Sequence, residues 1–479
     1  MSEHFALLVP GAKAEGEPLT VNAPFDNQAI ATVERGGRQA VEQAMATAYS
    51  LYRNRDGWLS PARRIEILKK TADLLYRQRE FLATESAREG GKPLPDSLVE
   101  IDRAVDSFRS CVDHLRVQAG NCIPMDITPS SANRLAFTIH EPIGVVLAFS
   151  AFNHPLNLIA HQIGPAIAAG CPVIVKPAEA TPLSCMRIVA IVREAGLPED
   201  WCQALVTTGR DVSMAMATDP RVAFFSFIGS SKVGWMLRSK LAPGTRCALE
   251  HGGAAPAIVM ADADLEQVVP LLCKGGMYHA GQVCVSVQRI FAHSVIIDKL
   301  AKQLAQACDG LKVGDPTLAE TEVGPLIREA EVQRVDAWVR EAIDGGASLL
   351  CGGKILSATT YQPTVLLNPP ADVRVSTQEI FGPVVCLYGF ADVDDAIARA
   401  NSLPFSFQAS VFTQDIDSAL RVSRRIDAAS VMINDHTAFR VDWMPFAGFK
   451  ESGYGVGGIP YTLKDMQVEK QIIIKSAEI

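Results

Sequence analysis

Apolar residues at helical spacing predict three helical stretches in the first quarter of the chain, two of which are clearly amphipathic. One has an apolar face over residues 65–75 and begins at Ser60 and Pro61, residue types favoured at the N-cap and first turn. The glycine pair at 90–91 predicts its end. The second helix has an apolar stripe over residues 98–115.

From Gly144 onward, short and continuously apolar runs alternate with helical stretches. Such runs are typical of parallel strands that helices cover on both faces. The runs cover residues 145–149, 173–175, 204–206 and 222–225, then 257–260, 290–292, 384–387 and 430–433. The pattern predicts an α/β protein with a doubly wound nucleotide-binding half and a second α/β region.

The last apolar segment, VEKQIIIK at residues 468–475, predicts a strand with little of its own domain left to pair with. An apolar strand with a free edge is satisfied by another strand. We therefore expect it to pair with a neighbouring subunit.

Composition narrows the class of protein. With 479 residues, 48% hydrophobic and 20% charged, the chain should fold into two or three domains. Its formal charge of −8 gives no electrostatic footprint for nucleic acid or an anionic membrane. No run approaches the ~20 apolar residues of a spanning helix, and the first residues lack the pattern of an export signal. Eleven cysteines without a CxxC pair indicate reduced thiols, and hence the cytoplasm.

Cys284 is the candidate nucleophile. It ends the motif GQVC, between a helical stretch and the strand-like VQRIFA. A nucleophilic cysteine needs access, room for its substrate and a route to the thiolate. Its polar, glycine-bearing surroundings distinguish Cys284 from the other ten cysteines, which are typical of small buried hydrophobes. Gly281 is expected to leave room for the substrate.

Two further side chains suit the same chemistry. Glu250 precedes Gly252 and Gly253, so its carboxylate can move as a general base must. A strand-end surface carboxylate is the alternative. Asn153 follows the run at 145–149, at the end where open sheets bind ligands, and its amide suits an oxyanion hole. An Asx-turn that opens the next helix is the alternative for Asn153.

Two motifs suit a nucleotide cofactor. Lys176 and Glu179, in VIVKPAE, follow a buried run and could hydrogen-bond ribose hydroxyls. FIGSSKVG places Gly229, Ser230 and Gly234 at a strand-to-helix turn, where a helix start can receive a pyrophosphate. The glycine spacing is not GxGxxG, and a tight helix entry is the alternative.

Taken in order, these motifs resemble the aldehyde dehydrogenase superfamily over essentially the whole chain. The matching motifs are FNHP, KPAE, FIGSSKVG, LEHGG, GQVC, EIFGPV and PFAGFKESGYG. The resemblance implies a Rossmann-type cofactor domain, an α/β catalytic domain and a β oligomerisation arm, and hence a homodimer or homotetramer. The implied limits are 1–120 and 141–249 for the NAD-binding domain, 250–440 for the catalytic domain, and 121–140 with 460–479 for the arm.

The resemblance also implies residue roles. Cys284 is implied as nucleophile, Glu250 as general base, and Asn153 as oxyanion donor together with the Cys284 backbone N–H. The implied cofactor-binding residues are Ser150, Lys176, Glu179, Gly229, Ser230, Val233, Gly252, Glu379 and Phe381. Phe152 stands where family members have tryptophan, and residues 207–209 replace the usual GxG, departures that bear on cofactor affinity.

The implied reaction oxidises an aldehyde to a carboxylic acid with NAD. A thiohemiacetal and then a thioester form on Cys284, and water activated by Glu250 hydrolyses the thioester. No metal is expected, since the nine histidines show no ligand spacing. NAD is preferred to NADP because Glu179 would repel a 2′-phosphate. Acyl transfer to coenzyme A and a catalytically silent binding protein are the alternatives, which Glu250 and the intact Cys284 disfavour.

Two arginines are candidates for the substrate tail. Arg440 lies just before PFAG, and Arg103 lies off the apolar stripe of its helix; in the family both regions border the substrate tunnel. With His154 and Phe446, they predict a small aldehyde with an anionic or strongly polar tail. Val283 stands where branches that act on phosphorylated aldehydes often have arginine, so the anion site is a weaker one. The alternative is an apolar tunnel for aromatic or medium-chain aldehydes, with both arginines facing water. Its lining would be Phe152, Tyr278, Phe439, Trp443 and Phe446.

Overall fold

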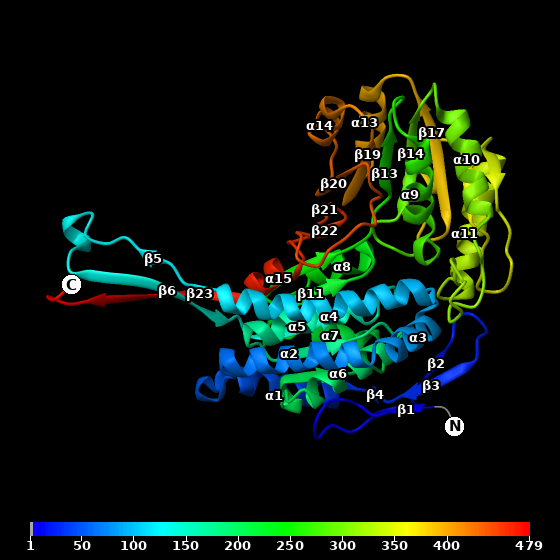
Figure 1. Ribbon diagram of the computed structural model, residues 1–479. Coiled ribbons are helices and arrows are strands. Elements are labelled where there is room, and N and C mark those ends of the chain that lie inside the picture. The colour runs from blue at the N-terminus through cyan, green and yellow to red at the C-terminus, as the bar shows by residue number, and fades with distance from the viewer. Residues whose placement is uncertain (1–2) are drawn as a thin grey trace.

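The computed structural model describes residues 3–479 and consists of two α/β bodies, each built on its own sheet, with a thin arm projecting from one of them (Figure 1). The first sheet has five parallel strands and one antiparallel edge strand. Its order is β22 (Gly453–Tyr454), β12 (Arg246–Glu250), β11 (Val222–Ile228), β7 (Val145–Phe149), β8 (Val173–Lys176) and β9 (Cys202–Ala204).

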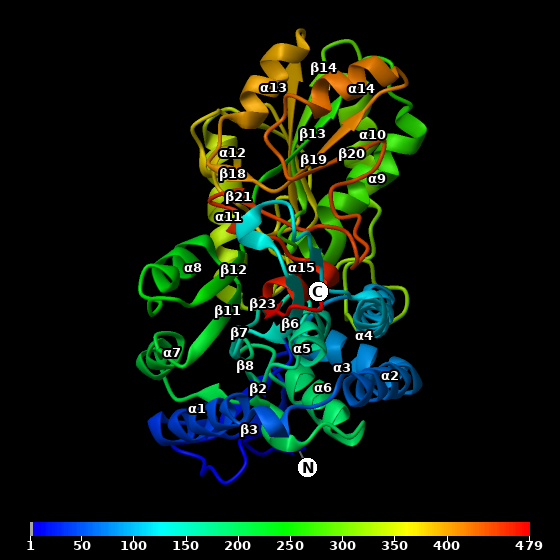
Figure 2. The same cartoon turned by 90° about the vertical axis from the view of Figure 1, so that its left-hand side faces the viewer.

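Helices cover both faces of this sheet, as Figure 2 shows. One face carries α1 (Arg38–Arg53), α7 (Arg210–Ala217) and α8 (Ser231–Arg238). The other carries α2 (Pro61–Arg77), α3 (Arg79–Gly90), α4 (Leu94–Val117), α5 (Asn157–Ala169), α6 (Leu183–Glu194) and α15 (Ile459–Asp465). Val145 and Leu147 of β7 pack on the first side, and Val146 and Ala148 pack on the second. Burial on both faces explains why this strand is apolar throughout.

The helix predicted to run from Ser60 to the glycine pair is two helices. α2 begins as predicted, with the Ser60 hydroxyl accepting a hydrogen bond from the Arg63 N–H at 3.3 Å. Gln78 then leaves the helical conformation, and α3 follows. The prediction of one helix was wrong because Leu75 and Leu82 are seven residues apart, a spacing that stays in phase across a one-residue break.

The second sheet has seven strands, parallel except for its edge strand β15. Its order is β15 (Ser348–Cys351), β16 (Thr364–Leu367), β17 (Val384–Phe390), β14 (Val287–His293), β13 (Ala255–Val259), β19 (Gln408–Phe412) and β20 (Ser430–Ile433). Around it are α9 (Leu265–Met277), α10 (Ile297–Asp309), α11 (Glu329–Asp344), α12 (Arg374–Thr377), α13 (Val393–Asn401) and α14 (Ile416–Ser423). Four of these strands contain predicted runs. β19 was missed because its buried Gln408 and Ser410 interrupt the apolar pattern.

The arm is a three-stranded antiparallel sheet made from two distant parts of the chain. β23 (Gln467–Lys475) pairs along its whole length with β6 (Arg134–Pro142), whose other neighbour is β5 (Cys122–Ile123). The prediction that the last strand has little of its own domain to pair with was wrong, because its partner lies far back in the sequence. The outer edge of β23 is the edge of this sheet.

Three smaller sheets complete the fold. They are β1 (Glu3–Phe5) with β3 (Ala29–Val33) and β2 (Leu19–Asn22), β4 (Arg35–Gly36) with β10 (Val206–Thr207), and β18 (Phe405–Ser406) with β21 (Phe449–Lys450). The predicted strand at 204–206 is therefore divided between β9 and β10, which belong to different sheets. Across residues 3–479, no helix combines the length and apolarity needed to cross a bilayer.

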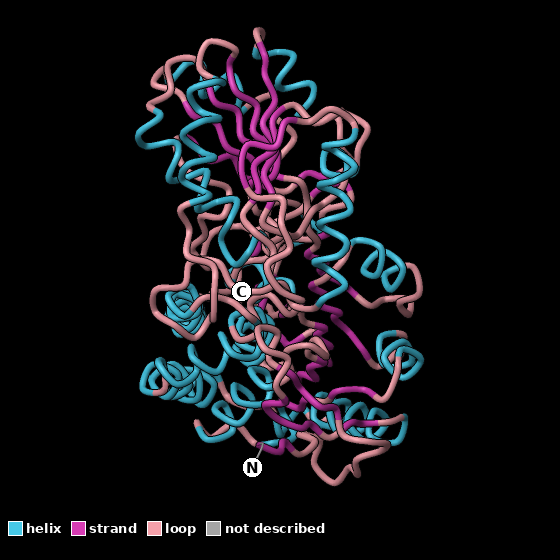
Figure 3. The backbone as a smooth tube through the Cα atoms, turned by 90° about the vertical axis from the view of Figure 1, so that its right-hand side faces the viewer, coloured by secondary structure: helices cyan, strands magenta, loops and turns pink. Residues whose placement is uncertain are grey.

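Loops gather between the two large sheets (Figure 3). The strands β7, β8 and β12 each lead into a loop at their carboxyl ends, and β14 follows the loop that carries Cys284. In parallel α/β sheets, ligands bind beyond the carboxyl ends of the strands, so the candidate site lies in this layer of loops.

Candidate active site

Cys284 lies on the loop between α9 and β14. Just before it His279, Ala280 and Gly281 all have positive φ angles of 48°, 54° and 69°, a left-handed conformation that non-glycine residues rarely adopt. A Cβ on Gly281 would lie 2.0 Å from the carbonyl oxygen of Gly382. The expectation that Gly281 leaves room for the substrate was wrong, since neighbouring backbone fills that space.

The thiol of Cys284 lies in apolar surroundings and packs near Phe446. Burial raises the pKa of this thiol to about 12, and the negative charge of Glu250 acts in the same direction. The guanidinium of Arg440 opposes both effects on the pKa. Because the thiolate is the nucleophile, a base must assist Cys284 at neutral pH.

Asn153 follows β7, and its side chain reaches the Cys284 loop. Its Nδ2 donates a hydrogen bond to the Gln282 carbonyl oxygen at 2.9 Å. The Gln282 side chain is itself anchored, since it donates to the Pro325 carbonyl at 3.2 Å and accepts from the Ile327 N–H at 3.0 Å. The structure thus brings Asn153 and Cys284 together through Gln282, which sequence reasoning missed although it stands inside GQVC.

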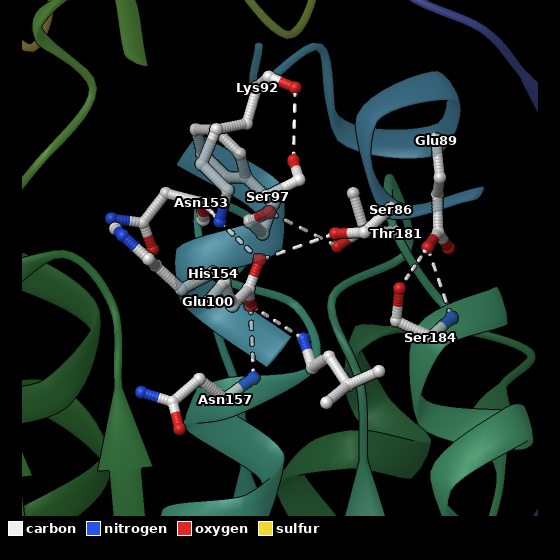
Figure 4. A network of polar contacts seen from close by, with 12 residues as sticks. Ser86, Glu89, Lys92, Ser97, Glu100, Asn153, His154, Asn157, Thr181 and Ser184 are labelled. Carbon is white, nitrogen blue, oxygen red and sulfur yellow. Dashed lines mark hydrogen bonds and ion pairs between the residues drawn. The ribbon is translucent and has the colours of Figure 1, made fainter. Parts of the chain in front are cut away.

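A buried ion pair supports the loop that carries Asn153 (Figure 4). Glu100, on α4, accepts hydrogen bonds from the N–H groups of Leu156 and Asn157 at 3.0 and 2.9 Å, where α5 begins. Lys92 donates to Glu100 and lies 3.4 Å from the Asn153 carbonyl oxygen. Both charged side chains are buried, so each depends on the other for neutralisation.

Glu250 ends β12 and is half-buried, unlike the surface carboxylate that was its alternative. A Cβ on Gly457 would lie only 2.3 Å from the Glu250 Oε1, so a side chain there would displace the Glu250 carboxylate. Burial raises the pKa of Glu250, and Arg440 partly offsets this rise. A carboxylate with a raised pKa is a stronger base, which suits it to accept a proton from a thiol or a water.

Glu379 and Phe381 lie beside the glycine turn that follows Glu250. Glu379 accepts a hydrogen bond from the Gly253 N–H at 3.2 Å, and a Cβ on Gly252 would lie 1.6 Å from its Oε1. Burial raises the pKa of Glu379 to about 8. Phe381 has a φ of 47°, and its ring meets that of Phe152 edge to face.

Lys176 and Glu179 lie at the carboxyl end of β8, beside the end of β7. The Lys176 Nζ donates to the Pro177 carbonyl at 3.3 Å. Burial lowers the pKa of Lys176, while exposed Glu179 opposes that shift. The Ser150 hydroxyl, just after β7, is buried and has no hydrogen-bond partner within residues 3–479.

The helix α8 begins just after β11, the strand that lies next to β7 in the sheet. Ser230 is its N-cap, and no side chain caps the helix there. Val233, in the first turn, is 41% exposed. His251 Nδ1 lies 3.0 Å from the Gly229 carbonyl oxygen, and a Cβ on Gly234 would lie 1.9 Å from the His251 ring. These contacts hold the turn and leave the first N–H groups of the helix available.

Arg440 and Arg103 converge on one carboxylate, Asp442. Arg103 donates through Nε and Nη2 to the two Asp442 oxygens at 3.1 and 2.6 Å. His161 Nε2 lies 2.8 Å from Oδ1 of Asp442, and Arg440 Nε lies 3.6 Å from it. Arg440 also places Nη2 3.1 Å from His161 Nδ1 and its guanidinium 3.4 Å from the Phe446 ring centre.

The burial of these groups distinguishes an anion-binding site from the alternative, an apolar tunnel with both arginines facing water. The Arg440 side chain is only 8% exposed, so it does not face water. Phe446 is buried beneath it, whereas Phe439 and Trp443 of the apolar alternative are 45% and 54% exposed. His154 is buried, with Nε2 3.0 Å from the Tyr278 hydroxyl; burial and nearby cations lower its pKa.

Asp442 and His161 were missed by sequence reasoning. Asp442 stands two residues after Arg440 in the sequence, and this nearby opposite charge is a local signal that could have identified it. Its contacts with His161 and Arg103 span 281 and 339 residues, and no local pattern reports contacts of that separation.

Comparison with known proteins matches residues 12–472 to the aldehyde dehydrogenase family. The chain belongs to this family. Aldehyde dehydrogenases are NAD(P)-dependent oxidoreductases, so the predicted enzyme class and the α/β aldehyde dehydrogenase fold are confirmed.

Curated and solved aldehyde dehydrogenases resemble the chain over nearly its full length. It is 36% identical to 3-sulfolactaldehyde dehydrogenase of Priestia aryabhattai, over 98% of both chains. It is 30% identical to aldehyde dehydrogenase 21 of Physcomitrella patens, solved with the reaction product succinate, with a TM-score of 0.95 and coverage of 100% and 99%. Glyceraldehyde-3-phosphate dehydrogenase GapN of Methanocaldococcus jannaschii, complexed with NADP, is 34% identical at a TM-score of 0.91, with coverage of 97% and 100%.

The residues of this aldehyde dehydrogenase fit a dinucleotide cofactor. The start of α8 has no side-chain cap, so its N–H groups can receive a pyrophosphate. The buried Ser150 hydroxyl lacks a partner, which a ligand would provide. Lys176 and Glu179 stand beyond the neighbouring strand β8, where ribose hydroxyls can meet an ammonium and a carboxylate.

Proposed function

We propose that this aldehyde dehydrogenase oxidises small aldehydes with an anionic or strongly polar tail to the corresponding acids. The carrying observation is the buried guanidinium of Arg440, whose Nε has no hydrogen-bond partner in the described chain. Its charge acts on both Cys284 and Glu250, so it lies near the reacting groups. A buried guanidinium with free donors suits an anionic group of the substrate.

The relatives support this substrate class. Their names include dehydrogenases of 3-sulfolactaldehyde and lactaldehyde, and one solved relative holds succinate. We assign Arg440 as the main tail-binding residue, with Arg103 beside it and His154 and Phe446 as further lining.

In the proposed mechanism, Glu250 takes the proton of the Cys284 thiol, and the thiolate adds to the aldehyde carbon. Asn153 uses one amide hydrogen for Gln282, and its second hydrogen can stabilise the oxyanion together with the Cys284 backbone N–H. The chemistry that a bound nicotinamide supplies is hydride acceptance, which leaves a thioester on Cys284.

Glu250 next serves the hydrolysis. After passing its first proton to solvent, it accepts a proton from water, and the resulting hydroxide attacks the thioester carbonyl. The carbon–sulfur bond breaks, the carboxylic acid leaves, and the thiol is restored. Because Glu250 activates water, we favour hydrolysis over acyl transfer to coenzyme A.

We propose that the Ser150, Gly229, Ser230, Val233 and Gly252 positions hold the cofactor together with Lys176, Glu179, Glu379 and Phe381. NAD is the preferred cofactor, because the exposed Glu179 carboxylate would repel the 2′-phosphate of NADP.

We also propose a homodimer or homotetramer in the cytoplasm, with the domain limits given by the sequence. The free outer edge of β23 supports assembly through the arm. The eleven cysteines, all unpaired, are typical of a reducing compartment.

A substrate panel on the wild type and Arg440→Ala tests the proposal. The panel comprises succinic semialdehyde, phosphonoacetaldehyde, lactaldehyde, hexanal and benzaldehyde, each with NAD, NADP and added coenzyme A. A hydrogen bond to a charged group is worth roughly 1.5–3 kcal/mol. Arg440→Ala should therefore lower kcat/KM for the anionic aldehydes by about tenfold to a hundredfold more than kcat/KM for the neutral ones.

The measured quantity is the ratio of anionic to neutral substrates, because Arg440 also lowers the pKa of Cys284. Arg79→Ala is a matched control, since it breaks a surface ion pair with Asp102 on α4. If hexanal or benzaldehyde is the best substrate and Arg440→Ala leaves the ratio unchanged, the anion site is wrong and the apolar alternative holds. A preference for NADP would overturn the interpretation of Glu179.

A further inference from the structure

The proposed tail site contains a carboxylate of its own. Asp442 is 1% exposed and lies at the centre of the cluster formed with Arg103, Arg440 and His161. Burial opposes its ionisation, but the charge of Arg103 and the hydrogen bonds from Arg103 and His161 outweigh burial and hold the pKa of Asp442 well below its usual range. Asp442 is therefore negatively charged at any working pH.

Asp442 forms an ion pair with one of the two arginines, Arg103. Arg103 makes a bidentate ion pair with the two Asp442 oxygens, so its charge is neutralised within the protein. Arg440 lies at 3.6 Å from the same carboxylate and makes its one hydrogen bond, through Nη2, with His161. A guanidinium has five N–H donors, so the donors on Nε and Nη1 and the second donor on Nη2 of Arg440 have no hydrogen-bond partner within residues 3–479.

The remaining neighbours add no positive charge. Burial lowers the pKa of His161, which is therefore neutral around pH 7 and above. Asp106, one turn after Arg103 on α4, adds negative charge near Asp442. Two arginines and one aspartate thus give the cluster a net charge of no more than +1.

We propose that Asp442 makes the site selective for aldehydes whose tail carries a single negative charge, and that it disfavours tails that carry two. The inference rests on the proposed function. One free guanidinium can neutralise a carboxylate or a sulfonate. A second negative charge would lie unpaired beside Asp442 and Glu250 in a poorly hydrated site, where repulsion is strong.

Family membership does not decide this point. The names of the relatives include both a sulfonate aldehyde and a phosphate aldehyde as substrates. The balance of charges around Asp442 is a property of this chain, and it favours the first kind of tail.

A matched set of substrates tests the inference on the wild-type enzyme. Sulfoacetaldehyde and phosphonoacetaldehyde have head groups of similar shape, with one and two negative charges at about pH 8. We expect kcat/KM to be at least about tenfold higher for the sulfonate. The monomethyl ester of phosphonoacetaldehyde, with a single charge, should regain most of the difference.

A variant then tests the role of Asp442. Asp442→Asn keeps an oxygen for Arg103 but raises the cluster charge by one, so the preference for the sulfonate should fall by about tenfold. Asp102→Asn on α4, which breaks the surface pair with Arg79 of α3, should leave the preference unchanged. The ratio of two substrates is a readout that a general loss of folding would not move.

Each outcome is decisive. Equal or better use of the phosphonate dianion by the wild type would overturn the inference, as would an unchanged ratio in a folded Asp442→Asn variant. If Asp442→Asn does not fold, the three wild-type substrates still decide. If propanal is used as well as every anionic aldehyde, the proposed function itself fails instead.

Discussion

The ionised form of Glu250 disfavours ionisation of the Cys284 thiol. Burial raises the pKa of each group, and the charge of Glu250 further raises the pKa of the Cys284 thiol. In the free enzyme the thiol is therefore protonated at neutral pH. A protonated thiol reacts slowly with alkylating reagents, because the thiolate is the reactive form.

Alkylation of the free enzyme by iodoacetamide tests this pairing. With a thiol pKa of about 12, the rate at Cys284 should rise about tenfold per pH unit from about pH 7 to 10, without a plateau. Glu250→Gln removes a charge that raises the pKa, so alkylation should become faster at about pH 10, where hydroxide deprotonates the thiol without help from Glu250. Cys284→Ser accounts for labelling of other thiols, such as exposed Cys122. A wild-type plateau below about pH 9 would contradict the raised pKa.

At the scale of residues, the sequence predicts the reacting groups better than their partners. Cys284, Glu250 and Asn153 stand in motifs with local features, glycines above all, that point to chemistry. Their assigned roles stay predictions. Gln282 and Asp442 act through contacts made only when distant segments fold together, so no spacing in the sequence reports them.

Two helices near the site begin at buried carboxylates that come from other helices (Figure 4). Glu100 accepts from the N–H groups at the start of α5, and Glu89 accepts from those of Leu183 and Ser184 at the start of α6. The N-cap residues there have no capping side chain. Each carboxylate also meets the positive end of the helix dipole. Caps of this kind have no local sequence signature, unlike Ser60 at α2.

The two carboxylates offer a matched pair of variants. Glu100→Gln leaves Lys92 buried without its counter-ion, which should destabilise the fold by about 3–5 kcal/mol. Because the same pair supports Asn153, kcat should fall about tenfold as the oxyanion donor loses its position.

Glu89→Gln provides the control, since the hydrogen bonds of Glu89 within residues 3–479 go to Leu183 and Ser184 at the start of α6. It should lower the Tm while kcat stays within about twofold. Thermal unfolding and steady-state kinetics check both. Equal losses of kcat in the two variants would show that Glu100 acts only through stability.

At the scale of elements, continuous apolar runs are reliable where both faces of a strand are buried. The run at 145–149 coincides with β7. An apolar run does not show the boundary between two sheets, as at residues 204–206, which are divided between β9 and β10. Helical periodicity likewise does not show a break that keeps the apolar positions in phase, as at Gln78 between α2 and α3.

At the scale of the whole molecule, the arm stands apart from both bodies (Figure 1). Ile473 and Ile474 of β23 are 55% and 42% exposed, and the outer edge of the strand has no partner among residues 3–479. Removing the residues after Lys470 deletes most of the partner of β6 as well as this edge. The variant should dissociate or become insoluble.

Sedimentation of the full chain and the truncated chain at micromolar concentration checks the assembly. Activity with a neutral aldehyde reports whether a soluble truncated chain retains its site. A monomeric full chain, or a truncated chain with unchanged mass in solution, would contradict assembly through the arm.

The pairing of β6 with β23 also delays completion of the arm during synthesis, because the two strands are far apart in the sequence. Thr138 and Glu469, which hydrogen-bond across the two strands at 2.6 Å, are 331 residues apart. At about 5–20 residues per second, a ribosome needs roughly 20–60 s to make the second strand after the first. During that interval β6 has only the short strand β5 as a partner, and the edge that β23 will cover is open on a growing chain. Neighbouring ribosomes on one message would hold several such strands close together, so shielding by a chaperone would favour correct pairing.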